Sequence, residues 1–282
     1  MYIVELNEDN RADYSEYISE DISENIGRTF YHGLIAEEED KPIAGIIWEI
    51  RNALSDKDNI SNIVWLRIDD ENVAVELFDK YRECVAEEDV VTSSYCLPAI
   101  SMDKEKKALE DAGFSMAFTE GDLIKARLSE IDEIAYIKKA KTKEYIKPLK
   151  NLTQREFVSS VRRFTTKGLF GLCEDLPYLS KAYFENDVSC YLEEDGDIIG
   201  LLLFHKKPSG TLEVVIMQVL GNEHVKDLLS MMCQALSAAK EIYDQQTEIC
   251  IDRHNYSTLA LSEKLFPRGF GIPVYTGSRN ER

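Results

Sequence analysis

The chain has 282 residues, of which 44% are hydrophobic, and a formal net charge of −19. At roughly 150 residues per domain, this length favours two domains over one. Residues 1–140 hold 33 Asp+Glu and 15 Lys+Arg, whereas residues 141–282 hold 19 and 18, so the acidity belongs to the first half. A negative field repels nucleic acid and anionic membrane surfaces, which argues against both as main partners.

Neither targeting nor metal chemistry is indicated by the sequence. Residues 1–8 lack a basic stretch and a long apolar run, and the longest strongly apolar run, Ile198–Phe204, is too short to span a bilayer. We therefore expect a cytoplasmic protein. The six cysteines form no Cys-x-x-Cys pair and the four histidines no pair at helix spacing, which predicts reduced thiols and no metal site.

The first half opens with helical segments and continues with an alternation of strands and helices. The pattern predicts strands at 42–50, 63–68 and 89–95, a polar hairpin loop at 52–62, and a final helix at 103–112 that ends at Gly113-Phe114. An amphipathic helix follows the second strand, with apolar residues at i, i+3, i+4, i+7 and i+11: Ala74, Leu77, Phe78, Tyr81 and Val85.

A basic connector, 136–150, separates this half from the next. Its lysines are typical of a solvated linker, although a docking patch has the same composition. Thr153-Gln154-Arg155-Glu156 resembles a capping box, which predicts a helix over Phe157–Phe164 and a new domain beginning near Asn151.

The second half repeats the first. An acidic turn leads into an apolar strand at Ala36–Ile47 and again at Leu192–Leu202. Gly45 and Gly113 are 68 residues apart, and Gly200 and Gly269 are 69 apart. The helix offsets recur at Val225, Leu228, Leu229, Met232 and Leu236, followed by a strand at 248–252, a helix at 257–265 and Gly269-Phe270. Repetition at this spacing indicates two copies of one fold in tandem.

The segment Ile251–Leu265, with Asn255, Glu263-Lys264-Leu265 and then Gly269-Phe270, resembles the GNAT superfamily of acyl-CoA-dependent N-acetyltransferases. The resemblance implies an α/β (α+β) fold of two tandem acyl-CoA N-acyltransferase-like domains, each a twisted mixed sheet flanked by helices. Two central parallel strands of each sheet would separate, and the pantetheine arm of the cofactor would lie in the split. We expect a structural first domain at 1–135, the linker at 136–150, and a candidate acyl-CoA site at 151–282.

The family motif for the pyrophosphate is a loop of the form Gln/Arg-x-x-Gly-x-Gly/Ala, where backbone N–H groups and a helix N-terminus meet the phosphates. The second copy reads Gln218-Val219-Leu220-Gly221-Asn222-Glu223 and departs from the motif at Glu223. The first copy, 69–74, matches only the final Ala and carries three carboxylates that oppose a pyrophosphate.

The resemblance therefore implies cofactor-binding residues Gln218, Val219, Leu220, Gly221 and Asn222, together with Asn255 on the CoA arm. Plainer alternatives stay open for each of these positions. Glu223 also fits a helix-start stabiliser that fills the anion site, Gly221-Asn222 a simple turn, and Asn255 a helix cap.

Acetyl transfer to an amine needs a base that removes a proton from the substrate ammonium. Glu213 and His254 are the candidate catalytic bases, with a solvent-facing strand residue and a turn residue as the alternatives. The family's acid, a Tyr in the last helix, has no counterpart, since the matching positions hold Leu109 in one copy and Ser262 or Leu265 in the other.

The sequence thus predicts an N-acetyltransferase that uses acetyl-CoA as co-substrate, needs no metal, and acts on a small-molecule or peptide amine as a monomer or homodimer. The alternative is a catalytically inactive GNAT-fold binding or assembly protein. Aminoacyl-tRNA-using ligases also stack two such folds, but the net charge of −19 argues against a tRNA partner.

Overall fold

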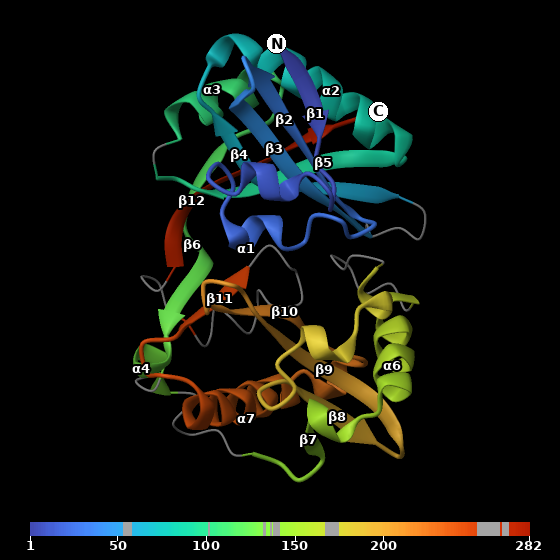
Figure 1. Cartoon of the computed structure of the whole chain (residues 1–282). Coiled ribbons are helices and arrows are strands. Elements are labelled where there is room, and N and C mark those ends of the chain that lie inside the picture. Colours follow the sequence, from blue (N-terminus) through green and yellow to red (C-terminus); the bar gives the residue numbers. More distant parts are fainter. Residues whose placement is uncertain are drawn as a thin grey trace. The chain divides into compact units, whose positions relative to one another are not determined.

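A computed structural model describes residues 1–52, 58–100, 102–131, 134, 135, 137, 142–166, 175–252, 266 and 271–282 (Figure 1). The chain divides into two compact units. The first unit comprises Met1–Thr119, Gly171–Asp175 and Pro273–Arg282, and the second unit comprises Glu120–Phe170 and Leu176–Ile272. No helix within the described ranges is both long and apolar enough to span a bilayer.

The first unit is built on a mixed sheet. Its strands lie in the order β1 (Tyr2–Glu5), β2 (Tyr31–Glu38), β3 (Lys41–Asn52), β4 (Asn59–Ile68), β5 (Val90–Pro98) and β12 (Gly271–Asn280). Only β4 and β5 pair in parallel, and the other neighbours are antiparallel. The helical segments are η1 (Arg11–Tyr14), α1 (Glu20–Ser23), η2 (Glu71–Val73), α2 (Ala74–Glu87) and α3 (Asp103–Asp111).

Apolar side chains cover both faces of this sheet, because successive strand residues point to opposite sides. Leu34 and Ile46 belong to a buried cluster with α2 and α3, whereas Ile35 and Ile47 belong to one with the segment before β2. The five apolar residues predicted to form the buried stripe of α2 are all buried. Helices and the N-terminal segment therefore enclose the sheet from its two faces.

The second unit has the same plan. Its strands lie in the order β6 (Ala117–Arg127), β11 (Glu248–Asp252), β10 (Leu212–Val219), β9 (Asp197–Lys206), β8 (Cys190–Glu194) and β7 (Ile146–Pro148), with only β10 and β11 parallel. The helical segments are α4 (Leu128–Ile131), η3 (Leu149–Asn151), α6 (Gln154–Thr166), η4 (Leu176–Tyr178), η5 (Lys181–Tyr183), η6 (Asn222–His224) and α7 (Asp227–Ile242).

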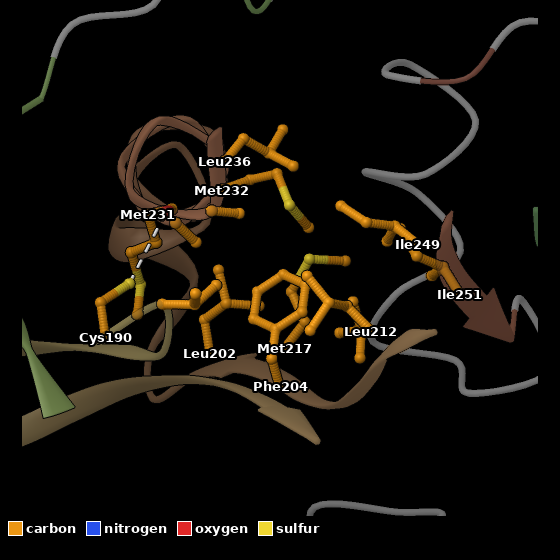
Figure 2. Close-up of a cluster of buried hydrophobic side chains, with 14 of the residues drawn as sticks. Cys190, Leu202, Phe204, Leu212, Met217, Met231, Met232, Leu236, Ile249 and Ile251 are labelled. Atoms are coloured by element: carbon orange, nitrogen blue, oxygen red, sulfur yellow. Dashed lines mark hydrogen bonds between the residues drawn. The ribbon is translucent and has the colours of Figure 1, made fainter. Parts of the chain in front are cut away.

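The core of the second unit lies between α7 and the sheet. Figure 2 shows Met231, Met232 and Leu236 of α7 facing Leu202 and Phe204 of β9 together with residues of β10 and β11. At one edge the Cys190 thiol lies 3.6 Å from the Met231 carbonyl oxygen. This packing holds β10 and the start of α7 together, and the loop between them is the predicted cofactor loop.

The backbone confirms that the two halves repeat one design. Both β2–β3 and β8–β9 are joined by two-residue turns with positive φ at both positions, 51° and 60° at Glu39-Asp40 and 52° and 84° at Asp195-Gly196. The fourth strand of each copy also carries a β-bulge, at Val64 in β4 and at Val215 in β10. Shared turn and bulge positions explain the echo in the sequence.

The last strand of each copy lies in the other unit. β6 follows Gly113-Phe114 in the chain but pairs with β11, and β12, the last strand of the second copy, pairs with β5. The compact units therefore differ from the contiguous ranges 1–135 and 151–282 expected from the sequence. Local patterns cannot reveal this exchange, because β6 and β12 have equivalent places in the two copies.

Several predicted elements change in detail. β3 and β4 are longer than predicted, since the polar residues Asn52 and Asn59 pair across the hairpin. β7 lies inside the predicted basic linker. Val225 is 50% exposed and precedes α7, so its placement in the buried stripe was wrong. The predicted helix at 257–265 and Gly269 lie outside the described residues.

Candidate functional site

The parallel strands of the second unit separate early. β10 and β11 pair at only two positions, Leu212 with Ile249 and Glu213 with Cys250. The bulge at Val215 follows at once, and β10 continues to Val219 without a further β11 partner among the described residues. Within the described residues, the β10 backbone beyond Glu213 therefore has no ladder partner on its β11 side, at the place where the family resemblance implies the split for a pantetheine arm.

Glu213 lies at the last paired position before this split. It is in register with His205 of β9, and its carboxylate forms an ion pair of 2.9 Å with Lys207 Nζ. The Glu213 side chain is 33% exposed and that of Lys207 18%. Lys207 already occupies the position beside the Glu213 carboxylate that a substrate ammonium would take. Glu213 could therefore act as a base only after this ion pair breaks.

The predicted loop residues divide by what they contact. Val219 and Leu220 pack against the core beneath α7, and the Leu220 N–H donates to the Ile199 carbonyl oxygen at 2.7 Å. Gln218 is 2% exposed, and its side-chain oxygen has no hydrogen-bond partner in the described part of the chain. A buried amide oxygen without a partner is costly, so Gln218 is the loop residue with unused polar capacity.

Gly221 adopts φ +88°, the left-handed region in which other residues are strained. A β-carbon at this position would lie 2.7 Å from Cδ and 2.9 Å from Oε2 of Glu223. The Glu223 carboxylate therefore lies against the glycine whose open space the family motif uses for phosphate. Asn222 is part of the backbone of η6.

A cluster of charged side chains surrounds His224, the last residue of η6, just before α7. Its Nε2 lies 3.3 Å from Glu194 and 3.7 Å from Glu223, and its Nδ1 lies 3.4 Å from Asp227. In the described ranges, no group of three or more His, Cys, Asp or Glu side chains is arranged to hold a metal ion.

Asp227 is the buried member of this cluster, with 7% exposure. Burial disfavours its charge, but hydrogen bonds from Lys143 and Tyr145 outweigh that effect and keep its pKa below the usual value. The start of α7 thus already holds a stable negative charge, which meets the positive end of the helix dipole.

The corresponding split in the first unit is occupied by the chain itself. β4 pairs with β5 from Asn59 to Ile63 and then continues to Ile68. There the buried Glu105 of α3 accepts a hydrogen bond of 2.8 Å from the Ile68 N–H. The Ile68 N–H, beyond the paired part of β4, therefore already has an acceptor within the chain.

The acidic loop after β4 is also bound by α3. Lys104 Nζ donates to the Asp69 carbonyl oxygen at 2.6 Å, and Lys107 forms an ion pair of 2.5 Å with Glu71. Hydrogen bonding to Lys107 lowers the pKa of Glu71. The carboxylate of Asp70 accepts from the Asn72 N–H at 3.0 Å and so caps η2.

Two of the predicted site residues, His254 and Asn255, lie outside the described residues. Sequence reasoning missed Lys207 as the partner of Glu213, and it missed His224 and Asp227 beside the loop. The i, i+3 spacing of His224 and Asp227 was a usable signal, whereas Lys143 and Glu194 reach the cluster only through tertiary packing.

No protein-family model matches the sequence, and no curated protein matches it. Among solved structures, a tandem GNAT protein from the clavulanic acid biosynthesis pathway, solved without AcCoA, is similar over 100% of this chain and 98% of its own length, with a TM-score of 0.58 and 10% identity. This chain has the tandem GNAT fold. A GNAT N-acetyltransferase from Kribbella flavida is similar over 82% of this chain and 86% of its own, with a TM-score of 0.52 and 11% identity. At these identities the similarity extends to the fold alone, and it confirms the tandem GNAT architecture predicted from the repeat.

Proposed function

We propose that this protein is an N-acetyltransferase that transfers an acetyl group from acetyl-CoA to an amine, with its site in the second unit. The observation that carries the proposal is the freed edge of β10 after Glu213. Among the described residues, no side chain hydrogen-bonds to this edge, whereas Glu105 fills the equivalent place in the first unit. This difference between the two units supports placing the acyl donor beside β10 of the second unit.

The residues beside the split suit parts of such a donor. Gln218 has a buried polar atom without a partner, and the Gly221 turn leads to the start of α7, where backbone N–H groups meet anions. Glu223 opposes an anion there, so the fit of the loop is partial. When bound, acetyl-CoA would supply the thioester that the amine attacks.

Glu213 is the residue proposed to take the proton from the substrate ammonium, since it lies at the mouth of the split. The substrate cation would have to displace Lys207 from the carboxylate. His254 stays a proposed second base, and Asn255 a proposed contact to the CoA arm.

Calorimetric titration with acetyl-CoA and CoA tests the proposal. The Gly221→Asp variant adds a second carboxylate beside Glu223 and a side chain where φ is +88°, so we expect affinity to fall about tenfold or more. Gly210→Asp is the matched control, because Gly210 also has positive φ, +90°, but nothing lies within 4 Å of its β-carbon position. Absence of binding to the wild-type protein at millimolar ligand would contradict the proposed function.

A second candidate function is a binding or assembly protein without catalysis. Two contacts within the chain favour it. Glu223 lies against Gly221, where the acyl donor would bind, and Lys207 pairs with Glu213, where the substrate amine would bind. Release of free thiol from acetyl-CoA that depends on added amine separates the two functions. An enzyme releases thiol with at least some amines, and a binding protein with none.

A further inference from the structure

We propose that Glu223 is a specificity-determining residue of the second unit, which weakens the binding of thioester donors that carry a diphosphate, acetyl-CoA included, and leaves the binding of donors without one unaffected. The inference rests on the proposed function, because it concerns the donor end of the same split. It goes beyond that function by naming the residue, Glu223, that determines which class of donor binds well.

The position of the carboxylate is the first step of the argument. Glu223 follows Gly221 by two residues, in η6, and its carboxylate turns back onto the glycine, with Oε2 2.9 Å from the place of a β-carbon. The turn needs the positive φ of Gly221, so the glycine is required by the backbone whether or not a phosphate binds. The space beside Gly221 that a side chain would fill is taken by the Glu223 carboxylate.

The residues around Glu223 compensate its negative charge only in part. His224 Nε2 lies 3.7 Å from the Glu223 carboxylate, but the same imidazole also faces Glu194 and Asp227, so it is shared by three carboxylates. Lys143 and Tyr145 both engage Asp227. Within the described residues, Glu223 forms no ion pair with a lysine or an arginine, and His224 is its ion-pair partner.

A diphosphate bound at this turn would lie in contact with the Glu223 carboxylate and be repelled by it. The helix dipole of α7 would compensate little of this repulsion, because the charge of Asp227 already meets the positive end of that dipole. A donor with an uncharged pantetheine end would escape this repulsion. The Glu223 side chain is 71% exposed, so solvent and salt weaken the effect without removing it.

The experiment compares acetyl-CoA with S-acetylpantetheine, which lacks the diphosphate, in wild-type protein and in Glu223→Gln. We expect Glu223→Gln to bind acetyl-CoA about tenfold more tightly by calorimetry at low salt, and S-acetylpantetheine with unchanged affinity. The gain should shrink in high salt, as a charge effect does. Glu241→Gln, which removes an exposed carboxylate at the far end of α7, is the control and should change neither affinity.

Each other result has a distinct meaning. If Glu223→Gln leaves acetyl-CoA binding unchanged, or tightens both donors equally, Glu223 does not select by charge and the inference is overturned while the acetyltransferase proposal stands. If neither donor binds either protein at millimolar concentration, the proposed function fails and the inference with it. Because Glu223 is mostly exposed, the variant is expected to fold, and its melting temperature checks this.

Discussion

Glu105 in the first copy and Glu223 in the second have different roles beside the loop that follows the fourth strand. Glu105 is 9% exposed and closes the split of the first unit by accepting from a backbone N–H of β4. Glu223 is mostly exposed and lies on the loop of the second unit, where rotation of its own side chain would move the carboxylate aside. The first contact is part of the fold, and the second is open to competition by a ligand.

Removal of the Glu105 carboxylate should therefore destabilise the first unit. Glu105→Ala leaves the Ile68 N–H buried without an acceptor, which we expect to cost about 1–3 kcal/mol. Urea unfolding followed by tryptophan fluorescence measures this selectively, because both tryptophans, Trp48 and Trp65, are in the first unit. Glu110→Ala, on the exposed side of α3, is the control, and an equal loss in both variants would refute the role of the hydrogen bond.

At this scale the sequence indicated some residues and concealed others. The failure of the motif at Glu223 was visible, because a carboxylate stood where the family has a small residue. Lys207 was not foreseen as the partner of Glu213, since the two residues meet only when β9 and β10 form their hairpin. A pattern within one element cannot report an ion pair across two.

Among the elements, α6 is the one whose start was predicted most directly. The Glu156 N–H lies 3.3 Å from Thr153 Oγ1, and the Thr153 N–H donates to the Glu156 carboxylate at 2.8 Å, which confirms the capping box. Thr153→Ala should destabilise the second unit by about 1 kcal/mol. Hydrogen exchange over α6 checks this, with Ser159→Ala, on an exposed site of the same helix, as a variant expected to show no loss.

The same contact has a defined pH dependence. Hydrogen bonds from the backbone N–H and then the hydroxyl of Thr153 lower the pKa of Glu156. A carboxyl whose pKa is lowered in the folded state stabilises above its ordinary pKa, and this contribution disappears as the pH falls through the lowered value. The stability advantage of the wild type over Glu156→Ala should accordingly be full at neutral pH and vanish in acid. An advantage that is constant with pH would contradict the ionic capping contact.

The α7 prediction shows the limit of offsets copied from another element. The buried stripe of α7 uses Leu228, Met231, Met232, Ala235 and Leu236, whereas the repeat offsets began it at Val225. The helix begins at Asp227 because η6 and its turn take up the preceding residues. The two copies share their strands and turns more closely than the starts of their helices.

For the whole molecule, the exchange of β6 and β12 is the feature with the widest effect. Each unit is closed by a strand from the other copy's end, so the repeat in the sequence and the compact units in the structure are not the same objects. The repeat and the order of strands and helices could be read from the sequence, because turns and periodicity are local, and the fold class followed from the resemblance to the GNAT superfamily. The exchange could not be read from it, because the sequence pattern of β6 and that of β12 are each compatible with pairing to β5 or to β11.

Deletion of residues 271–282 tests this exchange. We expect hydrogen exchange to accelerate in β5 and α2 of the first unit, because β5 loses its antiparallel partner, and to change little in β8 and β9. Removal of Arg282 alone is the control. Acceleration confined to β10 and β11 would instead support two contiguous copies, each closed by its own last strand.

The order of β5 and β12 in the chain sets the order in which a ribosome can complete the first unit. β5 emerges about 170 residues before its partner, a delay of roughly 10–30 s at usual translation rates. During that time β5, a β-prone strand without a charged residue, has an open edge of the kind that pairs with other chains. The half of the protein that is made first is thus the half that is finished last, and its yield should depend on chaperone supply.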